Sequence, residues 1–297
     1  MPGPRIAILT PAKGVYEATW PVVLSRLESA LSATGVEVVP TPWTDHVADA
    51  AGLAGFDLVL PLLTWGYHLD HARWLRACST WQAAGIAMAN PADVLAWNSD
   101  KRYLQRLADQ GVAIPPTTWS EAVTADQVEA LFDATGAGQV IVKPVVSGGA
   151  WKTQRLRRGD PLADLPEAAA MLQPYLPTIE REGETSLLYF GGRLSHAVNK
   201  RPAAGDFRIQ LDFGGSYHAV PEPPAGAVAL AERTLAAIGE PLLYARIDML
   251  PDADGRWLLM EAELIEPDFF LGQDPAAGAG FAAALRARLG QGAGTAS

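Results

Sequence analysis

The sequence contains very little cysteine and no excess of positive charge. Cys78 is the single cysteine, which excludes an intramolecular disulfide and a cysteine-rich metal site. It shares a helical spacing of apolar residues with Trp74 and Trp81, so we interpret Cys78 as a core residue. The formal net charge is −10, so the sequence offers no basic surface for an extended contact with nucleic acid.

Long hydrophobic runs are also missing, and no stretch approaches the length of a membrane span. Residues 1–9 lead directly into a short apolar segment without the features of a signal peptide. We therefore expect a soluble cytoplasmic protein with no membrane partner. Hydrophobic residues make up 49% and charged residues 19% of the 297 positions, which is typical of a globular chain with one large or two to three small domains.

The most informative segment consists of two apolar runs, residues 245–250 and 257–264, joined by a turn-forming stretch. This pattern predicts a β-hairpin. Glu261 and Glu263 are two positions apart and therefore point to the same face, where Asp248 can meet them from the neighbouring strand. Three carboxylates on one face repel each other unless a cation neutralises them. Hard oxygen ligands suit Mg²⁺, which is usually completed by phosphates, so the hairpin predicts a magnesium site.

The remaining pattern alternates between helices and strands. In the first part it predicts strands at residues 5–10, 36–40 and 56–61 and helices at residues 20–34 and 70–84. This order favours a small parallel α/β domain over residues 1–90.

Residues 91–173 read as a second region and residues 174–297 as a third, so the fold class is α/β with an α+β C-terminal part. The pattern here predicts a helix with Asn98 as its N-cap, strands at residues 139–144 and from residue 153, a hairpin of residues 185–190 and 193–198, and a helix at residues 225–238.

Polar groups that suit a polyphosphate occur in a fixed order along the second and third regions. They are Lys101 at a helix start, Lys143 at a strand end, the loop Ser147, Gly148 and Gly149, the segment Gln173, Pro174, Tyr175 and Leu176, then Glu180, Glu184, Lys200 and the hairpin carboxylates. Two lysines from different elements can bracket a polyphosphate. Glycines let backbone N–H groups approach a phosphate closely.

This ordered set resembles the ATP-grasp ligase superfamily over about residues 90–275, especially the branch of the glutathione synthetases, ribosomal-protein glutamate ligases, D-alanine–D-alanine ligases and cycloserine-forming cyclo-ligases. The resemblance implies an ATP-grasp fold behind an N-terminal α/β domain. It implies ATP held by Lys101, Lys143 and a closing glycine loop, and adenine read by the hinge at residues 173–176. It further implies nucleotide contacts for Glu180 and Glu184.

Asp248, Glu261 and Glu263 correspond to the family's metal ligands, which implies two Mg²⁺ ions, with Mn²⁺ as an alternative. The family's metal motif usually ends in Glu-x-Asn, and this chain carries Glu263 instead of the asparagine. The extra charge bears on the number of ions or their affinity. The run at residues 261–267 most resembles the cycloserine-forming type.

The implied activity is ATP-dependent ligation of a carboxylate to an amine through an acyl phosphate, on a small amino-acid-like or peptide substrate. Arg246 is the main candidate for stabilising the transferred phosphoryl group, with Lys200 as a second candidate, while Arg208 is a candidate for gripping a substrate carboxylate. Three other functions stay open: an intramolecular cyclo-ligase, a non-catalytic nucleotide sensor, and a metal-dependent hydrolase or phosphatase.

The N-terminal region offers fewer signals. Tyr67 and His68 follow a predicted strand end, where α/β sheets bind ligands, and they either contact the substrate or form a core-capping aromatic cluster. His71 lies beside this turn and is interpreted as structural. Family members often dimerise through this domain, which implies a homodimer as one option.

Overall fold

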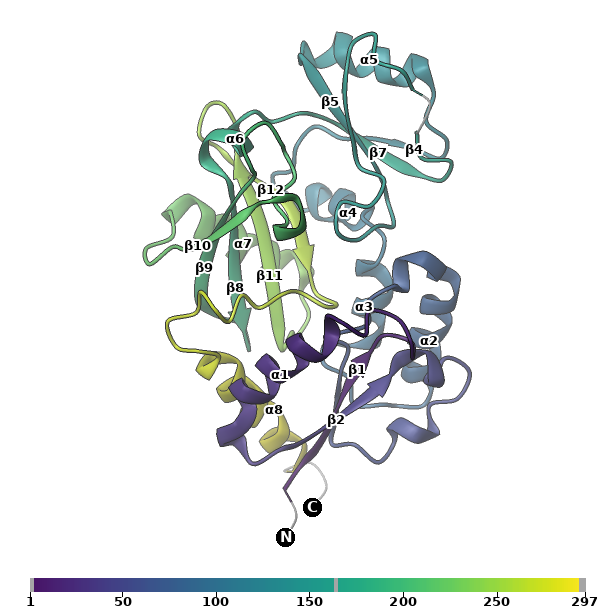
Figure 1. The fold of residues 1–297 in the computed structure, drawn as a ribbon, viewed down its shortest axis with the longest axis vertical. Coiled ribbons are helices and arrows are strands. Elements are labelled where there is room, and N and C mark those ends of the chain that lie inside the picture. The colour runs from purple at the N-terminus through teal and green to yellow at the C-terminus, as the bar shows by residue number, and fades with distance from the viewer. Residues whose placement is uncertain (1–2, 163–164, 294–297) are drawn as a thin grey trace.

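The computed structural model describes residues 3–162 and 165–293. It is a mixed α/β structure with three sheets (Figure 1). The strands are β1 (Arg5–Thr10), β2 (Glu37–Pro42), β3 (Leu58–Leu60), β4 (Thr118–Ser120), β5 (Gln139–Pro144), β6 (Gln154–Arg157), β7 (Ala170–Pro174), β8 (Glu184–Phe190), β9 (Arg193–Arg201), β10 (Ser216–Ala219), β11 (Tyr244–Pro251) and β12 (Trp257–Glu263).

The α-helices are α1 (Trp20–Leu31), α2 (His71–Ala83), α3 (Ala92–Asn98), α4 (Tyr103–Asp109), α5 (Ala125–Thr135), α6 (Thr178–Glu182), α7 (Ala225–Ile238) and α8 (Ala279–Ala293). Short 3₁₀ turns occur at Ser32–Thr34, Trp43–His46, Ala51–Leu53, Tyr67–Asp70 and Leu211–Phe213. None of the described helices is both long enough and apolar enough to cross a membrane.

The N-terminal sheet is parallel, in the order β2-β1-β3, as the alternation of strands and helices predicted. Its central strand β1 is buried from Ile6 to Leu9, which explains the continuous apolar run. Cys78 lies in the buried face of α2 between Trp74 and Trp81, so its interpretation as a core residue is confirmed.

The middle sheet is antiparallel, in the order β4-β7-β5-β6, and α5 packs against it (Figure 1). Thr124 begins α5 with a capping box, in which its side chain accepts a hydrogen bond from the backbone N–H of Gln127. The predicted strand at residues 139–144 is confirmed as β5, and the returning strand from residue 153 is confirmed as β6.

The C-terminal sheet has the order β10-β9-β8-β11-β12, and both predicted hairpins are present in it. Side chains alternate along β8: Leu187 packs in a cluster with helices α4 and α7, whereas Leu188 packs in a cluster with α1 and α8. Glu184 and Ser186 share the face of Leu188 but lie nearer the other end of the strand. That face is therefore apolar at one end and polar at the other.

One predicted local feature is wrong. Asn98 is the last residue of α3 and caps no helix start. Its side chain instead donates to the backbone oxygen of Ala262, at 2.8 Å, and accepts from the backbone nitrogen of Leu264, at 3.0 Å. These two hydrogen bonds hold the end of strand β12 against the C-terminal end of α3. The domain boundaries at residues 90 and 173 stay predictions.

Candidate active site between the middle and C-terminal sheets

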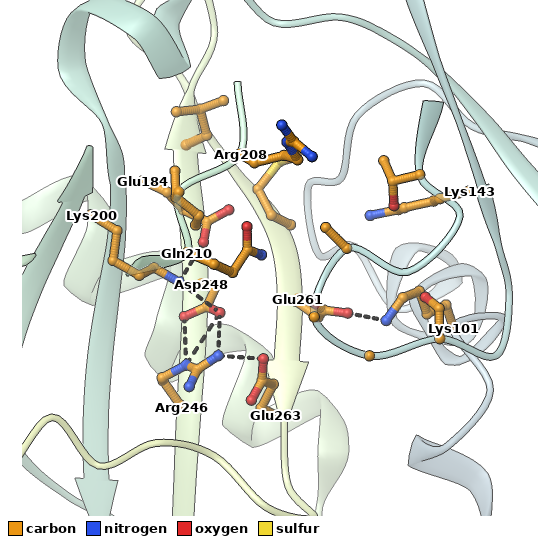
Figure 2. A pocket seen from close by; sticks show the side chains of 18 of the residues that line it. Lys101, Lys143, Glu184, Lys200, Arg208, Gln210, Arg246, Asp248, Glu261 and Glu263 are labelled. Carbon is orange, nitrogen blue, oxygen red and sulfur yellow. Dashed lines mark hydrogen bonds and ion pairs between the residues drawn. The ribbon is translucent and has the colours of Figure 1, made fainter. Parts of the chain in front are cut away.

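The hairpin of β11 and β12 brings the three predicted metal ligands together. Asp248 lies opposite Glu261, and Arg246 lies opposite Glu263, in the antiparallel register. Carboxylate oxygens of Asp248, Glu261 and Glu263 lie within 4.8 Å of one another. Figure 2 shows all three pointing to one side of the sheet. A register shift between Asp248 and Met249 interrupts the pairing directly beside this group.

Two buried cations neutralise Asp248. The Arg246 Nε lies 3.1 Å from Asp248 Oδ1, and the Lys200 Nζ lies 3.1 Å from Asp248 Oδ2. Lys200 also pairs with Glu184 at 2.5 Å, and Arg246 also pairs with Glu263. Acidic and basic side chains thus alternate in one network. The charge-assisted hydrogen bonds between them fix the position of each side chain, since they are strong in a site with little water.

The electrostatic environment shifts the pKa values of the acidic groups in opposite directions. Burial raises the pKa of Asp248, but Arg246 and Lys200 outweigh it and hold that pKa well below its usual range. Burial raises the pKa of Glu263 to about 7, against the opposing effect of Arg246. Burial also raises the pKa of Glu184, although Lys200 opposes the shift. A divalent ion would favour the charged form of all these groups.

The two predicted ATP lysines lie across from the carboxylates (Figure 2). Lys101 forms a salt bridge with Glu261. Lys143 lies at the end of β5, and no carboxylate in the described part of the chain forms a salt bridge with it. Burial lowers the pKa of Lys143, and Lys101 adds to this, although Glu261 opposes it. An anionic ligand would relieve the cost of keeping this lysine charged.

These groups line one cavity of about 380 Å³. The predicted residues in its lining are Lys101, Lys143, Ser147, Gly148, Gly149, Gln173, Pro174, Tyr175, Leu176, Glu184, Lys200, Arg208, Arg246, Asp248, Glu261 and Glu263. Glu180 is the predicted site residue that the lining does not include. It pairs with Arg155 at 2.9 Å and with the hydroxyl of Tyr175.

Several lining or supporting residues escaped the sequence analysis. Ser186 donates its hydroxyl to Asp248 Oδ1 at 2.6 Å, and the Tyr103 hydroxyl accepts from the backbone nitrogen of Ala262 at 2.8 Å. Gln210 and Glu266 line the cavity. Ser186 follows Glu184 by two positions on one strand, so the alternation of β8 was a signal that could have found it.

The N-terminal domain reaches the cavity through the turn after β3. Tyr67 lines the cavity, and the His68 ring lies so close to Gly148 that a Cβ there would be 3.3 Å from Nδ1. The His68 ring also lies 5.8 Å from the ring of Trp151 in the glycine loop. His71 bonds the Ser99 hydroxyl at 2.8 Å, which agrees with a structural role.

Arg208 borders the cavity on the segment between β9 and β10. Its guanidinium bonds Asp206, with Nη2 2.7 Å from Oδ2, and lies 3.7 Å from the ring centre of Phe213. Figure 2 shows Arg208 and Gln210 beside the end of the cavity that contains Glu184. Arg208 is thus held in place by Asp206 and Phe213 of its own segment.

Two antiparallel sheets that enclose lysines on one wall and a carboxylate hairpin on the other define an ATP-grasp ligase, and the chain belongs to this class of C–N bond-forming enzymes. Residues 6–90 match the family described as the D-cycloserine synthetase DcsG N-terminal domain. The cycloserine biosynthesis protein DcsG of Streptomyces lavendulae is 29% identical over 286 residues, covering 89% of this chain and 92% of that protein. A glutathione synthetase of Prochlorococcus marinus is 30% identical over 217 residues, covering 69% of this chain and 66% of that protein.

Solved structures agree with this assignment. The crystal structure of D-cycloserine synthetase DcsG superposes with a TM-score of 0.79 at 27% identity, covering 96% of this chain and 99% of that one. The D-alanine–D-alanine ligase of Bacillus anthracis has a TM-score of 0.73 at 18% identity and covers 99% of this chain and 98% of its own, which shows the shared fold.

ATP-grasp ligases use ATP and Mg²⁺, and solved relatives of this fold include complexes with ATP and with Mg and ADP. The donor set of this chain fits such an ion, because Asp248, Glu261 and Glu263 supply oxygens that converge on one point. A bound magnesium ion supplies charge neutralisation for phosphoryl transfer.

Proposed function

We propose that this enzyme activates the carboxylate of a small amino-acid-like substrate with ATP and then joins the activated carbonyl to an amine. The observation that supports the proposal most is the cavity itself. Lys101 and Lys143 face the carboxylates of Asp248, Glu261 and Glu263 across one volume of about 380 Å³. A metal triphosphate is the ligand that satisfies both walls at once.

Positions in the cavity lining support the following nucleotide contacts. Lys101 and Lys143 hold the phosphates, with the backbone of Ser147, Gly148 and Gly149 covering them. The hinge at residues 173–176 binds the adenine, and Glu184 contacts the ribose side. Glu180 supports the hinge from outside the cavity through the Tyr175 hydroxyl. Asp248, Glu261 and Glu263 hold two Mg²⁺ ions, with Mn²⁺ as a substitute.

The chemistry needs position and charge more than covalent help from the protein. A substrate carboxylate oxygen attacks the γ-phosphorus, the bond to the β-γ bridging oxygen breaks, and ADP leaves. The amine nitrogen then attacks the acyl carbon, loses a proton, and expels inorganic phosphate. Arg246 and Lys200 stabilise charge on the transferred group, and Arg208 grips the substrate carboxylate.

The similarity to the D-cycloserine synthetases supports ring closure within one molecule as one form of this reaction. The N-terminal match to the D-cycloserine synthetase family covers residues 6–90, the region that contributes Tyr67 to the cavity. The similarity to DcsG then continues through the rest of the chain. An intramolecular cyclo-ligase acting on an amino-acid derivative is therefore the second, more specific candidate.

The test is ADP release in Mg²⁺ with single amino-acid derivatives, each assayed with and without added amines, followed by mass spectrometry of the products. A ligase gives a product whose mass is the sum of acid and amine minus water. A cyclo-ligase needs no added amine, and its product is one water lighter than the substrate. ATP binding without ADP release from any derivative would favour a nucleotide sensor and reject both candidates.

We also propose that the enzyme acts in the cytoplasm, where ATP is abundant, as a homodimer formed through the N-terminal domain. Light scattering of the purified chain tests the dimer directly. A mass of one chain, 31.5 kDa, would reject it.

A further inference from the structure

Two acidic side chains of the cavity lining, Glu266 and Asp268, form no salt bridge in the described part of the chain. Asp268 is exposed, and its carboxylate accepts a hydrogen bond from the backbone nitrogen of Phe270. Four carboxylates of the lining, those of Glu184, Asp248, Glu261 and Glu263, each form a salt bridge with a lysine or an arginine. Glu266 lines the same cavity, yet within residues 3–162 and 165–293 no lysine or arginine forms a salt bridge with it. It is partly buried, and burial raises the pKa of Glu266 to about 8, with Glu263 adding to the shift. A cationic ligand beside Glu266 would therefore favour its charged form.

Two aromatic residues of the N-terminal domain, Trp65 and Tyr67, lie near Glu266. The Trp65 side chain donates a hydrogen bond to Glu266. Tyr67 is buried and lines the cavity beside it. Burial raises the pKa of Tyr67 well above its usual value, and Glu266 is the charge that contributes most to this. Tyr67 therefore presents a neutral phenol ring.

A carboxylate bordered by aromatic rings is suited to an ammonium group. The carboxylate accepts the N–H donors of the ammonium, and the ring faces attract its charge. Glu266 and Glu263 line the same cavity, so an ammonium bound by Glu266 would lie in the cavity that also contains the hairpin carboxylates.

We propose that Glu266 determines substrate specificity by binding the ammonium group of an α-amino acid beside the ring of Tyr67, while Trp65 holds the Glu266 carboxylate through its hydrogen bond. The inference rests on the proposed function, because it assigns one end of the same amino-acid-like substrate. Arg246 then receives the carboxylate end, beside the ion that Asp248, Glu261 and Glu263 would hold. The site as a whole would select acids that carry a free amine close to the carboxyl group.

A purely structural role is the competing explanation, in which Glu266 only anchors the Trp65 indole. Glu266→Gln separates the two roles, because the glutamine oxygen still accepts the indole N–H but carries no charge. Glu266→Asp keeps the charge and should retain part of the activity. Glu240→Gln is the matched control, since Glu240 is an exposed glutamate two residues after the end of α7.

The experiment measures ADP release by the full-length enzyme with Mg²⁺ and ATP. The probes are a panel of small α-amino acids and O-substituted serines in both configurations, each paired with its N-acetyl and des-amino counterparts. The expected result is turnover of free amines alone in the wild type and in Glu240→Gln. In Glu266→Gln the KM for the amine substrate should rise roughly 10- to 100-fold while the KM for ATP stays constant.

The outcomes separate the inference from the function on which it rests. Turnover of des-amino or N-acetyl members as readily as free amines would leave the ligase intact and overturn the role of Glu266. An unchanged amine KM in Glu266→Gln would overturn it as well. Absence of ADP release from every member of the panel would reject the ligase and, with it, the substrate-binding role of Glu266.

Discussion

Arg246 and Glu263 lie directly opposite each other on strands β11 and β12 and form a salt bridge. Glu263 occupies the position where the resemblance to the ATP-grasp superfamily leads us to expect asparagine. The residue that departs from the pattern is thus the partner of the arginine that we assign to phosphoryl transfer. Under the proposed function, Glu263 would both hold Arg246 and bind a cation.

Glu263→Asn should alter the requirement for magnesium. The variant removes one negative charge from the ligand set and one ionic partner from Arg246. An oxygen site binds a hard cation less tightly when its ligands carry less negative charge. The Mg²⁺ concentration for half-maximal ADP release should therefore rise by roughly 10-fold. Glu240→Asn, at an exposed position, is the control. An unchanged magnesium requirement would remove Glu263 from the ligand set.

Asp248→Asn should reduce turnover by roughly 100-fold or more, because it removes a charge at the centre of the site. It also leaves Lys200 and Arg246 with one fewer anionic partner. The thermal midpoint should therefore fall as well, which a melting curve measures. The matched control is Asp254→Asn, the same change at an exposed turn of the same hairpin. Wild-type turnover in Asp248→Asn would show that the metal assignment is wrong.

Lys143→Met should weaken ATP while leaving the fold as stable as before. Methionine is similar in length but lacks the ammonium group that would donate hydrogen bonds to a phosphate. The KM for ATP should therefore rise by roughly 10-fold or more. Burial lowers the pKa of Lys143, which means that its charge is unfavourable in the free enzyme. The melting temperature should thus be unchanged or higher. Arg233→Met, on the exposed side of α7, controls for loss of a cation; equal ATP KM values in the two variants would contradict the role of Lys143.

Acid should destabilise the protein in part through His196. Its Nε2 lies 2.9 Å from the backbone oxygen of Phe269, and burial lowers its pKa from the usual 6.5 although Asp274 opposes the shift. The neutral ring is favoured in the folded state, so its stabilising contribution is complete above pH 6.5 and is lost as the pH falls through the lowered pKa.

The measurement is urea unfolding of the wild type and of His196→Gln between pH 7.5 and about pH 5. The stability difference between the two should shrink as the pH falls, because the glutamine cannot become protonated. A difference that stays constant over this range would mean that His196 has the same pKa in the folded and unfolded states.

The hairpin was predictable from the sequence because its information is local. Asp248, Glu261 and Glu263 lie within one strand pair, so alternation alone places them on one face. The ordered lysines were predictable for a different reason, since their spacing along the chain resembles a known superfamily. The cavity lining brings both groups together.

Long-range side-chain contacts were not predictable. Asn98 looked like a helix cap, but its partners Ala262 and Leu264 are more than 160 positions away in the chain. Glu266 lies close in sequence to the predicted metal ligands. The role that we propose for it nevertheless depends on its contacts with Trp65 and Tyr67 from the N-terminal domain. No local pattern links these residues, because only the packing of two domains places them side by side.

The central claim is that the γ-phosphate of ATP is transferred to a substrate carboxylate at the hairpin of β11 and β12. It is tested most directly with a substrate from the ADP-release panel whose carboxylate oxygens are labelled with ¹⁸O. An acyl phosphate requires one labelled oxygen to leave with inorganic phosphate, so each turnover should yield one singly labelled phosphate. Unlabelled phosphate from a substrate that is fully converted would show that the carboxylate never received the phosphoryl group, and would contradict the account.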